Sequence, residues 1–310
     1  MGAIAGAAAI QSARTTFETV VETGLKRNGE NGIAQLIGQR FDADDGLTVD
    51  ISTHGAVPAM QQREESHVFT GLRTMNVKAP HNHYQAGVEL PRAQVVHDKS
   101  GTVGNALRAF QSEVDYFWAL LVVGKLDTNP TGIDGSTLIN DTHAFGANGG
   151  TWDNDVDAAL TFATWNTAQI KMGQLRDEWN QPLDLTLDTL IVNPAEMRTA
   201  TEILKSELRP VSVATDSSLN GVVGGSAVFN VYKSASITLI VTSRITAGNW
   251  FAMDSRYKPI AYAVWSDPQA HVADDMTGAE RMSRDVFQYS VEADATAVGF
   301  QPWGLVGRVA

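Results

Sequence analysis

Residues 67–90, HVFTGLRTMNVKAPHNHYQAGVEL, form a long extended stretch in which apolar and polar positions alternate loosely. A turn signal at residues 80–82 divides it into two runs, so the pattern predicts a long β-hairpin. The stretch has too few large apolar side chains to form a core, and an isolated two-stranded ribbon is at best marginally stable in water. The chain must therefore fold so that this ribbon packs against something else.

Composition narrows the class of protein. The 310 residues are 43% hydrophobic and 19% charged, enough for one large domain or two joined ones. The formal net charge is −12 and no window is dense in Lys and Arg, which argues against tight direct binding of nucleic acid. The absence of cysteine excludes disulfides, thiolate metal sites and Cys nucleophiles, and suits a reducing cytosol.

Neither a membrane span nor a secretory signal is expected. The most apolar stretch, YFWALLVVG at 116–124, is about half of the roughly 20 residues that cross a bilayer. The first ten residues, MGAIAGAAAI, lack the basic region of a signal peptide, so we interpret them as a flexible or docked arm.

Periodicity predicts two long helices in the first half of the chain. One begins near residue 12 and ends at the Asn28–Gly29 stop signal. The second covers about 101–125 and would run on the order of 35 Å, like a spine. Its apolar stripe repeats at steps of three and four and consists of Val103, Leu107, Phe110, Val114, Phe117 and Leu121.

The second half is predicted to be mixed. Residues 127–155 form an excursion rich in Gly, Asn and Asp that is too polar to be buried. A helix at about 156–177, a buried strand in LTLDTLIVNP and a helix in AEMRTATEILKSEL follow, with Pro194 in the first turn of the latter. The last third is predicted to be mainly strands, in VFNVYKSASITLIVTS, WFAMDS, PIAYAVW and DVFQYSVEADATAVGF.

The excursion begins like a calcium-binding loop. Asp127, Asn129, Thr131 and Gly132 imitate the opening of that motif, but Leu138 stands at the twelfth position, where a bidentate Glu is needed. We therefore expect a turn-rich loop with Asx caps.

Two other groups resemble metal ligands. Asp153, Asp155 and Asp157 could gather a cation, yet acids before a helix more often complement its N-terminal dipole, which is the interpretation we favour. His81 and His83 would share a strand face and could form a bidentate imidazole site. The sequence shows no third ligand beside them, so exposed histidines are expected.

No catalytic or cofactor motif is recognisable. The sequence lacks a Walker loop, a dinucleotide-binding glycine pattern and a nucleophile elbow, and the glycines of NGVVGGS at 220–226 are interpreted as a loop. We predict no catalytic residue, no metal and no cofactor, so the chain is expected not to be an enzyme.

Several stretches, in consistent order from about residue 50 to 310, resemble the major head subunit of Mu-like tailed phages, which has the HK97-type capsid fold. GAVPAMQQR, VELPRAQVVHD, DGSTLINDTH, NQPLDLTLDTLIVNP, WFAMDSRYKPIAY and YSVEADATAVGFQPWGLV carry the similarity. The matching residues are Gly55, Pro58, Met60, Arg63, Arg92, Asp98, Asp134, Gly135, Asp141, His143, Pro182, Leu183, Leu190, Ile191, Val192, Pro194, Trp250, Phe251, Asp254, Lys258, Pro259, Tyr289, Gly299 and Trp303.

This sequence departs from the family pattern at four places. Leu138 and Ile139 replace an aromatic pair, and Ser290 stands where the family has Gly. Asp294 stands where the family has Arg, so a subunit salt bridge made by that Arg is not expected here.

The resemblance implies an α+β chain with an N-terminal arm, an extended hairpin called the E-loop, a spine helix, and peripheral and axial domains. It divides the chain into an arm and helix (1–40), the E-loop hairpin with flanking strands (41–100), the spine helix (101–130), a mainly axial domain (131–245) and peripheral strands (246–310). The ribbon would then pack on a neighbouring subunit. The residues expected to contact that neighbour are Pro58, Met60, Arg63, Phe69, Leu72, Met75, Val77, Lys78, Tyr84 and Arg92.

The implied function is a capsid protein of the virion that self-assembles through hexamers and pentamers into an icosahedral shell around double-stranded phage DNA, without sequence-specific DNA contacts. The expected partners are further copies of itself, a portal, a separate scaffolding protein and a decoration protein, with assembly in the bacterial cytoplasm. Two alternatives stay open: an encapsulin-like nanocompartment shell of the same fold, and a soluble hydrolase or binding domain with its site in the 127–155 excursion.

Overall fold

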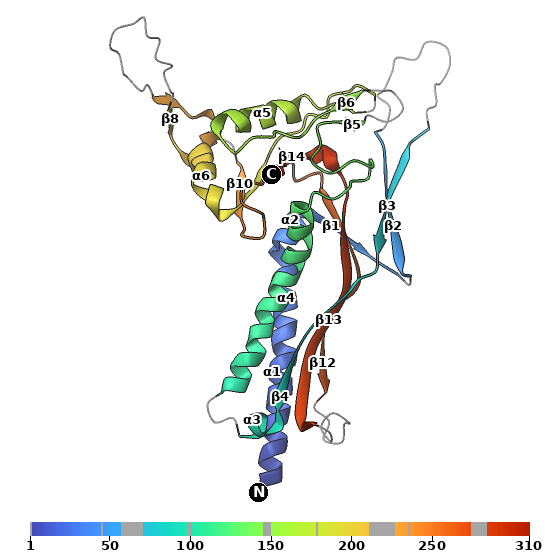
Figure 1. The fold of residues 1–310 in the computed structure, drawn as a ribbon, viewed down its shortest axis with the longest axis vertical. Helices are drawn as coiled ribbons and strands as arrows, with labels where there is room; N and C mark the ends of the chain where they lie inside the picture. The colour runs from blue at the N-terminus through green and yellow to red at the C-terminus, as the bar shows by residue number, and fades with distance from the viewer. Residues whose placement is uncertain are drawn as a thin grey trace, which may run out of the picture. The chain divides into compact units, whose positions relative to one another are not determined.

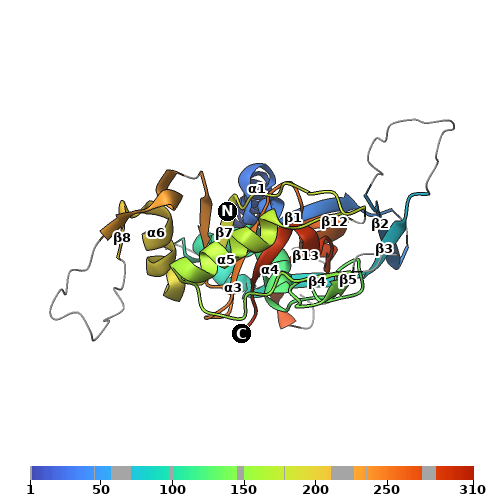
Figure 2. The same cartoon turned by 90° about the horizontal axis from the view of Figure 1, so that it is seen from above.

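The computed structural model describes residues 2–44, 46–56, 71–97, 101–144, 150–177, 179–210, 227–234, 236–273 and 284–310. The chain divides into two compact units. Unit 1 comprises residues 1–53, 76–126 and 260–299, and unit 2 comprises residues 54–75, 127–259 and 300–310. Figures 1 and 2 show the elements of each unit from two directions.

Unit 1 is built on a four-stranded sheet in the order β1-β12-β13-β4. β1 (Gly38–Asp42) is parallel to β12 (Ile260–Ala273), which pairs antiparallel with β13 (Val286–Gly299), and β13 pairs antiparallel with β4 (His83–Pro91). The helices of unit 1 are α1 (Gly2–Asn31), α2 (Ile33–Ile37), α3 (Arg92–Val96) and α4 (Thr102–Asp127).

The core of unit 1 lies between this sheet and the two long helices, which run along it in Figure 1. Phe17 of α1 and Leu107 of α4 are fully buried there with Phe287 and Tyr289 of β13. The rings of Phe17 and Tyr289 meet edge to face, with centroids 5.5 Å apart. The small N-terminal residues that we interpreted as an arm form the first turns of α1 rather than a separate segment.

Both long helices are confirmed, but the buried stripe of α4 differs from the predicted one in its second half. Val103, Leu107 and Val114 are buried as predicted, and the stripe then continues through Trp118, Val122, Val123 and Leu126. Phe117 and Leu121 are only half-buried. Because every position from 116 to 123 is apolar, the sequence pattern there could not distinguish the buried face.

The predicted hairpin of residues 67–90 is wrong in its pairing. β3 (Thr74–Pro80) pairs with β2 (Thr48–His54) in a two-stranded sheet, whereas β4 pairs with β13. The turn at residues 80–82 is therefore the place where the chain passes from one sheet to another. Alternation identifies a strand and its faces but not its partner, which explains the error. Both halves of the predicted ribbon thus have a strand partner within their own chain.

Unit 2 contains a second four-stranded sheet, in the order β10-β7-β11-β14. Its strands are β7 (Thr189–Val192), β10 (Thr238–Val241), β11 (Trp250–Met253) and β14 (Leu305–Arg308). α5 (Phe162–Gly173) and α6 (Met197–Lys205) contribute Trp165, Ala200 and Ile203 to the core against this sheet. The short pairs β5–β6 (His143–Ala144, Thr151–Trp152) and β8–β9 (Leu208–Pro210, Ala227–Phe229) complete the strands of this unit.

The structure differs from the predictions at two boundaries: the start of one helix and the division between the two units. The helix expected from residue 156 begins at Phe162, because Thr161 and Thr164 form a reciprocal capping box there. The two compact units also do not divide between residues 245 and 246, because β11 and β14 share a sheet with β7 and belong to unit 2. The assignment of peripheral and axial domains stays a prediction. Residues 260–299 alone supply the C-terminal strands of unit 1.

Candidate functional site

The β2–β3 ribbon carries part of the predicted subunit contact. At its far end, Gly55 N–H donates to the carbonyl of Arg73 at 2.7 Å, and Trp179 Nε1 donates to the carbonyl of Ala56 at 3.0 Å. At its base, His81 N–H donates to the carbonyl of Leu47 at 3.0 Å. Backbone bonds thus join the two flanks of the ribbon at each end, and the Trp179 side chain bonds the segment after β2.

The side chains proposed for this contact differ in exposure. Leu72 is 51% exposed and Lys78 is also exposed, whereas Met75 is buried and Val77 is half-buried. These four residues remain predicted contacts. The other four candidates on the approach, Pro58, Met60, Arg63 and Phe69, lie outside the described residues.

Tyr84 and Arg92 do not lie on the ribbon. Tyr84 is in β4 and its ring meets that of Phe117 in α4 edge to face, with centroids 5.3 Å apart. Arg92 is the first residue of α3, and its N–H donates to the carbonyl of Asp285 at 3.0 Å. Their role toward another subunit stays a prediction, since both already have contacts within unit 1.

The histidine pair singled out in the sequence lies at the junction between β3 and β4. His83 Nδ1 is 2.6 Å from Oδ1 of Asp294, and His81 Nε2 is 3.5 Å from the same oxygen. His81 also meets the ring of Trp265, with centroids 5.0 Å apart. Asp294, which replaces the family's Arg, is thus paired within its own chain.

The 127–155 excursion is organised around a buried histidine. His143 is wholly buried, its Nδ1 lies 2.6 Å from Oδ2 of Asp134, and its Nε2 lies 3.1 Å from Oδ1 of Asn154. The ring stacks on Trp152, with centroids 4.1 Å apart and planes 14° apart. Both ring nitrogens are thus engaged, so this Asp–His pair is arranged to hold the loop together rather than to accept a proton from a substrate.

Asn154 is the residue of this network that sequence reasoning missed. Its Nδ2 donates to the carbonyls of Leu138 and Leu305 at 2.7 and 2.9 Å, while its Oδ1 accepts from the N–H of Asn140 at 2.8 Å. Gly135, the remaining motif residue here, has φ of +89° and allows the turn between Asp134 and Ser136. The only sequence signal for Asn154 was its place within the acidic run WDNDVD.

The loop that resembled a calcium site uses its side chains internally. Asp127 accepts from the N–H and Oγ1 of Thr246 at 3.0 and 2.7 Å and from Nδ2 of Asn249 at 2.8 Å. Asn129 bonds the N–H and carbonyl of Ile139 at 2.8 and 3.0 Å. These bonds reach residues 10 to 122 positions away rather than forming local Asx caps, whereas the expected Asx turn occurs at Asp134, whose Oδ1 accepts from Ser136 N–H at 3.2 Å.

The acidic run before α5 does not complement a helix dipole, which corrects our interpretation. Oδ1 of Asp153 accepts from Asp155 N–H at 2.8 Å, and Oδ1 of Asp155 accepts from Asp157 N–H at 2.9 Å. Lys171 Nζ pairs with the Asp153 carboxylate and donates to the carbonyl of Asp155 at 2.5 Å. The acids thus form successive turns well before the first residue of α5.

Asp254, in the family-like segment after β11, is a buried ion-pair centre. Arg256 donates to it from Nη2 at 2.6 Å and from Nε at 2.9 Å, and Thr186 N–H donates at 3.0 Å. Burial of Asp254 opposes ionisation, but the bonds from Arg256 and the two backbone N–H groups hold the pKa of this carboxyl below its usual range. Nearby, burial lowers the pKa of Lys258.

The remaining motif residues of unit 2 support its sheet and turns. Trp250 is fully buried and its Nε1 donates to the carbonyl of Ala158 at 3.0 Å. Pro194 opens the turn before α6, where Asn193 Oδ1 accepts from Ala195 N–H at 2.9 Å. Four others complete the set: Pro182 is exposed, Leu183 and Trp303 pack on the core, and Pro259 is buried.

Two further motif residues of unit 1 lie in β13. Tyr289 is fully buried in the core, and Gly299 pairs with Ile260 at the end of the strand. All the family-motif residues that the structure describes therefore have structural positions, and their assignment as functional positions remains a prediction.

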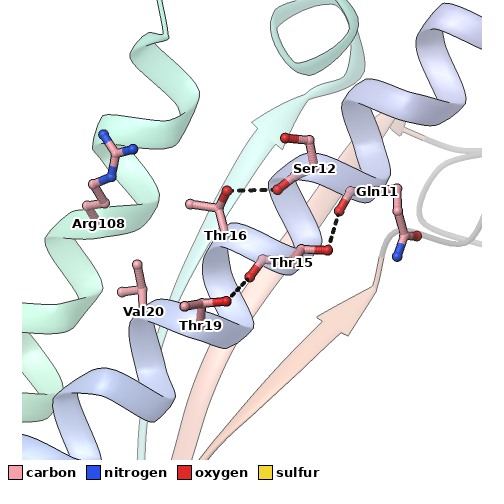
Figure 3. Close-up of a pocket in the computed structure, with 7 residues that line it drawn as sticks. All are labelled: Gln11, Ser12, Thr15, Thr16, Thr19, Val20 and Arg108. Atoms are coloured by element: carbon pink, nitrogen blue, oxygen red, sulfur yellow. Dashed lines mark hydrogen bonds between the residues drawn. The ribbon is translucent and has the colours of Figure 1, made fainter.

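A groove of about 490 Å³ lies between α1 and α4 (Figure 3). It is lined by Gln11, Ser12, Thr15, Thr16, Thr19, Val20 and Arg108. The three threonine hydroxyls donate to carbonyls four residues earlier in α1, at 2.7 to 2.9 Å. The lining thus combines helix surface with one cation and brings no acid beside a nucleophile.

The described residues contain neither a metal-binding cluster nor a membrane-spanning helix. No group of three or more His, Asp or Glu side chains among them is arranged so that it could hold a metal ion. None of the helices in that part of the chain is long and apolar enough to cross a membrane.

Comparison with known proteins places these features in a family. The model of a family described as phage capsid protein matches residues 76–306. No curated protein matches the sequence.

Solved capsid structures share the fold at low identity. The mature capsid of bacteriophage PhiM1 is 8% identical with a TM-score of 0.57, covering 90% of this chain and 87% of that one. The procapsid of bacteriophage JBD30 is 12% identical with a TM-score of 0.52, covering 98% and 75%. A virus-like particle from Pyrococcus furiosus is 10% identical with a TM-score of 0.52, covering 95% and 98%.

The family match spans most of the chain, and these likenesses show the HK97-type capsid fold. The broader family is confirmed, whereas the Mu-like subfamily stays a prediction. The chain belongs to the phage capsid protein family and is a major capsid shell protein.

Proposed function

We propose that this chain forms hexamers and pentamers that close into an icosahedral shell around double-stranded phage DNA. The family match over residues 76–306 carries the proposal. The described part of the β2–β3 ribbon supports it, because a two-stranded sheet needs a further partner for stability and identical subunits in a closed shell supply one. Its role is mechanical rather than catalytic.

We place the chain in the virion shell, assembled in the bacterial cytoplasm. The proposed partners are a separate scaffolding protein, a portal and a decoration protein. Within the subunit, we assign unit 1 to the peripheral domain, unit 2 to the axial domain, and β2–β3 with the residues between them to the E-loop. The net charge of −12 suits a container whose wall does not hold phosphate tightly.

The decisive experiment is light scattering on the purified chain at increasing concentration, with and without its scaffolding protein, followed by electron microscopy of the large species. Capsomers, shells or tubes are expected. A monodisperse monomer of about 33 kDa under every condition would contradict the proposal and direct attention to a soluble function.

A nanocompartment is the second candidate, because the fold also matches the virus-like particle from Pyrococcus furiosus over nearly the full length of both chains. Particles purified from infected or induced cells distinguish the two. Nuclease-protected DNA inside them supports the phage shell, and a protein cargo without protected DNA supports the compartment.

A further inference from the structure

Strands β8 and β9 of unit 2 present two exposed apolar side chains. Leu208 and Phe229 are directly paired across these antiparallel strands and are 54% and 65% exposed. Directly opposed residues of an antiparallel pair project from the same face, so these side chains lie next to each other. We call Leu208 and Phe229 the apolar pair.

The base of this ribbon is firmly held. Asn230, the residue after Phe229, is buried, and its Nδ2 donates to the carbonyls of Ile203 and Ser206 at 2.8 and 2.9 Å. Its Oδ1 accepts from the N–H of Tyr232 at 3.1 Å. The end of β9 is thereby fixed to the end of α6, so the exposure of the apolar pair belongs to a supported ribbon.

An ion pair borders the apolar pair. Lys233 Nζ lies 2.5 Å from Oε1 of Glu207, and both side chains are exposed. Glu207 directly precedes Leu208 in the sequence. Among the described side chains this ion pair thus places one positive and one negative charge at the border, which favours neither a polyanion nor a strongly basic partner. A second copy of the same surface offers a complementary charge to each.

We propose that the apolar pair, with Glu207 and Lys233 at its border, is a contact between identical copies of this chain. The inference rests on the proposed function, since a shell brings many copies together. In the described part of the chain β8 and β9 form a sheet of two three-residue strands, which is too small to be stable unaided. Covering it with a second copy removes the exposed apolar surface from water.

The absence of cysteine makes a cross-linking test selective. Leu208→Cys and Phe229→Cys are made as separate full-length chains, mixed in equal amounts, assembled as for the wild type, and oxidised mildly. Because each chain carries one thiol, any disulfide joins two copies, and it forms only where the Cβ atoms approach to roughly 4 Å. Ile170→Cys, an exposed apolar position on α5 of the same unit, is the matched control.

We expect covalent dimers or longer ladders in assembled particles of the mixed chains, at least about tenfold above the control chain and above unassembled protein. If the wild-type chains and the mixed cysteine chains both assemble normally, but the mixture forms no such cross-links, the inference is wrong and the proposed function stands. If wild-type chains do not assemble under any condition, the proposed function itself fails, and this inference with it.

A charge exchange gives a second measurement. Lys233→Glu and Glu207→Lys chains each place two like charges beside the apolar pair, and we expect each alone to assemble more slowly than the wild type. Mixing them restores the assembly rate only if Glu207 and Lys233 of different copies meet, because mixing cannot repair a pair within one chain. An unchanged rate on mixing would overturn the proposed contact.

Discussion

His143 and Asp134 form a buried pair, with Nδ1 of the imidazole 2.6 Å from Oδ2 of the carboxylate. Asn154 faces the other ring nitrogen with its oxygen, because its nitrogen donates to the carbonyls of Leu138 and Leu305. Both imidazole nitrogens therefore lie beside oxygen atoms in a place that solvent does not reach. The Asp134 carboxylate thus fixes the orientation of the ring from one side.

Asp134→Asn should therefore destabilise unit 2 strongly. Replacing the carboxylate by an amide weakens a buried hydrogen bond to a charged acceptor, which costs about 1–3 kcal/mol of the free energy of unfolding. Urea denaturation followed by Trp fluorescence measures this loss. Asp141→Asn is the control, because Asp141 is exposed and its Oδ1 accepts from Oγ1 of the neighbouring Thr142 at 2.8 Å. This substitution should change stability by less than about 0.5 kcal/mol. Equal stability of the two variants would contradict the structural role of the Asp134 carboxylate.

The lowered pKa of the Asp254 carboxyl predicts how the free energy of unfolding depends on pH. Despite its burial, hydrogen bonds from Arg256 and backbone N–H groups lower the pKa of Asp254 in the folded state. The folded state thus favours the ionised carboxylate, and the resulting stability is present above the unfolded-state pKa of about 3.9 and lost as pH falls through the lower folded-state pKa. We expect Asp254→Asn to cost about 1–3 kcal/mol at pH 7.

The difference in free energy of unfolding between wild type and Asp254→Asn should shrink as the pH is lowered below about 4. Chemical denaturation of both proteins between pH 7 and pH 3 measures it. Asp184→Asn is a useful control, since Asp184 is exposed and accepts from Arg256 through its carbonyl rather than its side chain. A difference that stays constant over this range would refute the role given to the Asp254 carboxylate.

The sequence predicted the helices and strands better than it predicted which strands pair with each other. The helix around Phe17 and the long helix α4 followed from periodicity, because a single apolar stripe identifies a helix without knowledge of the rest of the fold. The pairing of β4 with β13 joins residues about 200 positions apart, and alternation in either strand carries no information about that distance.

At the candidate sites, too, the sequence pattern identified single residues but not the contacts that they make. Asp134 and His143 were identified through the family pattern, whereas Asn154 was not, because an Asn among aspartates reads as a turn. The acids at 153–157 were assigned to a helix start that lies at Thr161 instead, since the capping box of Thr161 and Thr164 competes locally with any earlier start. The apolar pair was missed because exposure is a property of tertiary structure.

Gly307 in β14 should not tolerate a side chain. A Cβ added there would lie 2.3 Å from the carbonyl oxygen of Trp250 and 3.1 Å from Cα of Phe251, both backbone atoms of the paired strand β11. Since backbone cannot move aside like a flexible side chain, Gly307→Ala should lower the free energy of unfolding by about 1–3 kcal/mol. Differential scanning calorimetry measures the change in Tm. Gly173→Ala, which meets no atom within 4 Å, is the control, and an equal Tm for both variants would be inconsistent with this close approach.

Leu72→Asp tests the β2–β3 ribbon as an assembly element. Leu72 is 51% exposed in the single chain, so the substitution should change the free energy of unfolding by less than about 0.5 kcal/mol. If a neighbouring subunit covers this side chain, placing a carboxylate there buries an unpaired charge and should abolish or greatly slow shell formation.

The measurement pairs circular dichroism and thermal unfolding, which should match the wild type, with light scattering and electron microscopy of assembly. Ile170→Asp in α5 is the matched control, because Ile170 is exposed to a similar extent. Normal assembly of Leu72→Asp would mean that no neighbouring subunit covers Leu72. Val77 and Lys78, nearer the base of the ribbon, would then be the next positions to substitute. Loss of assembly in Leu72→Asp alone would identify the ribbon as a surface that a folded subunit needs another copy to cover.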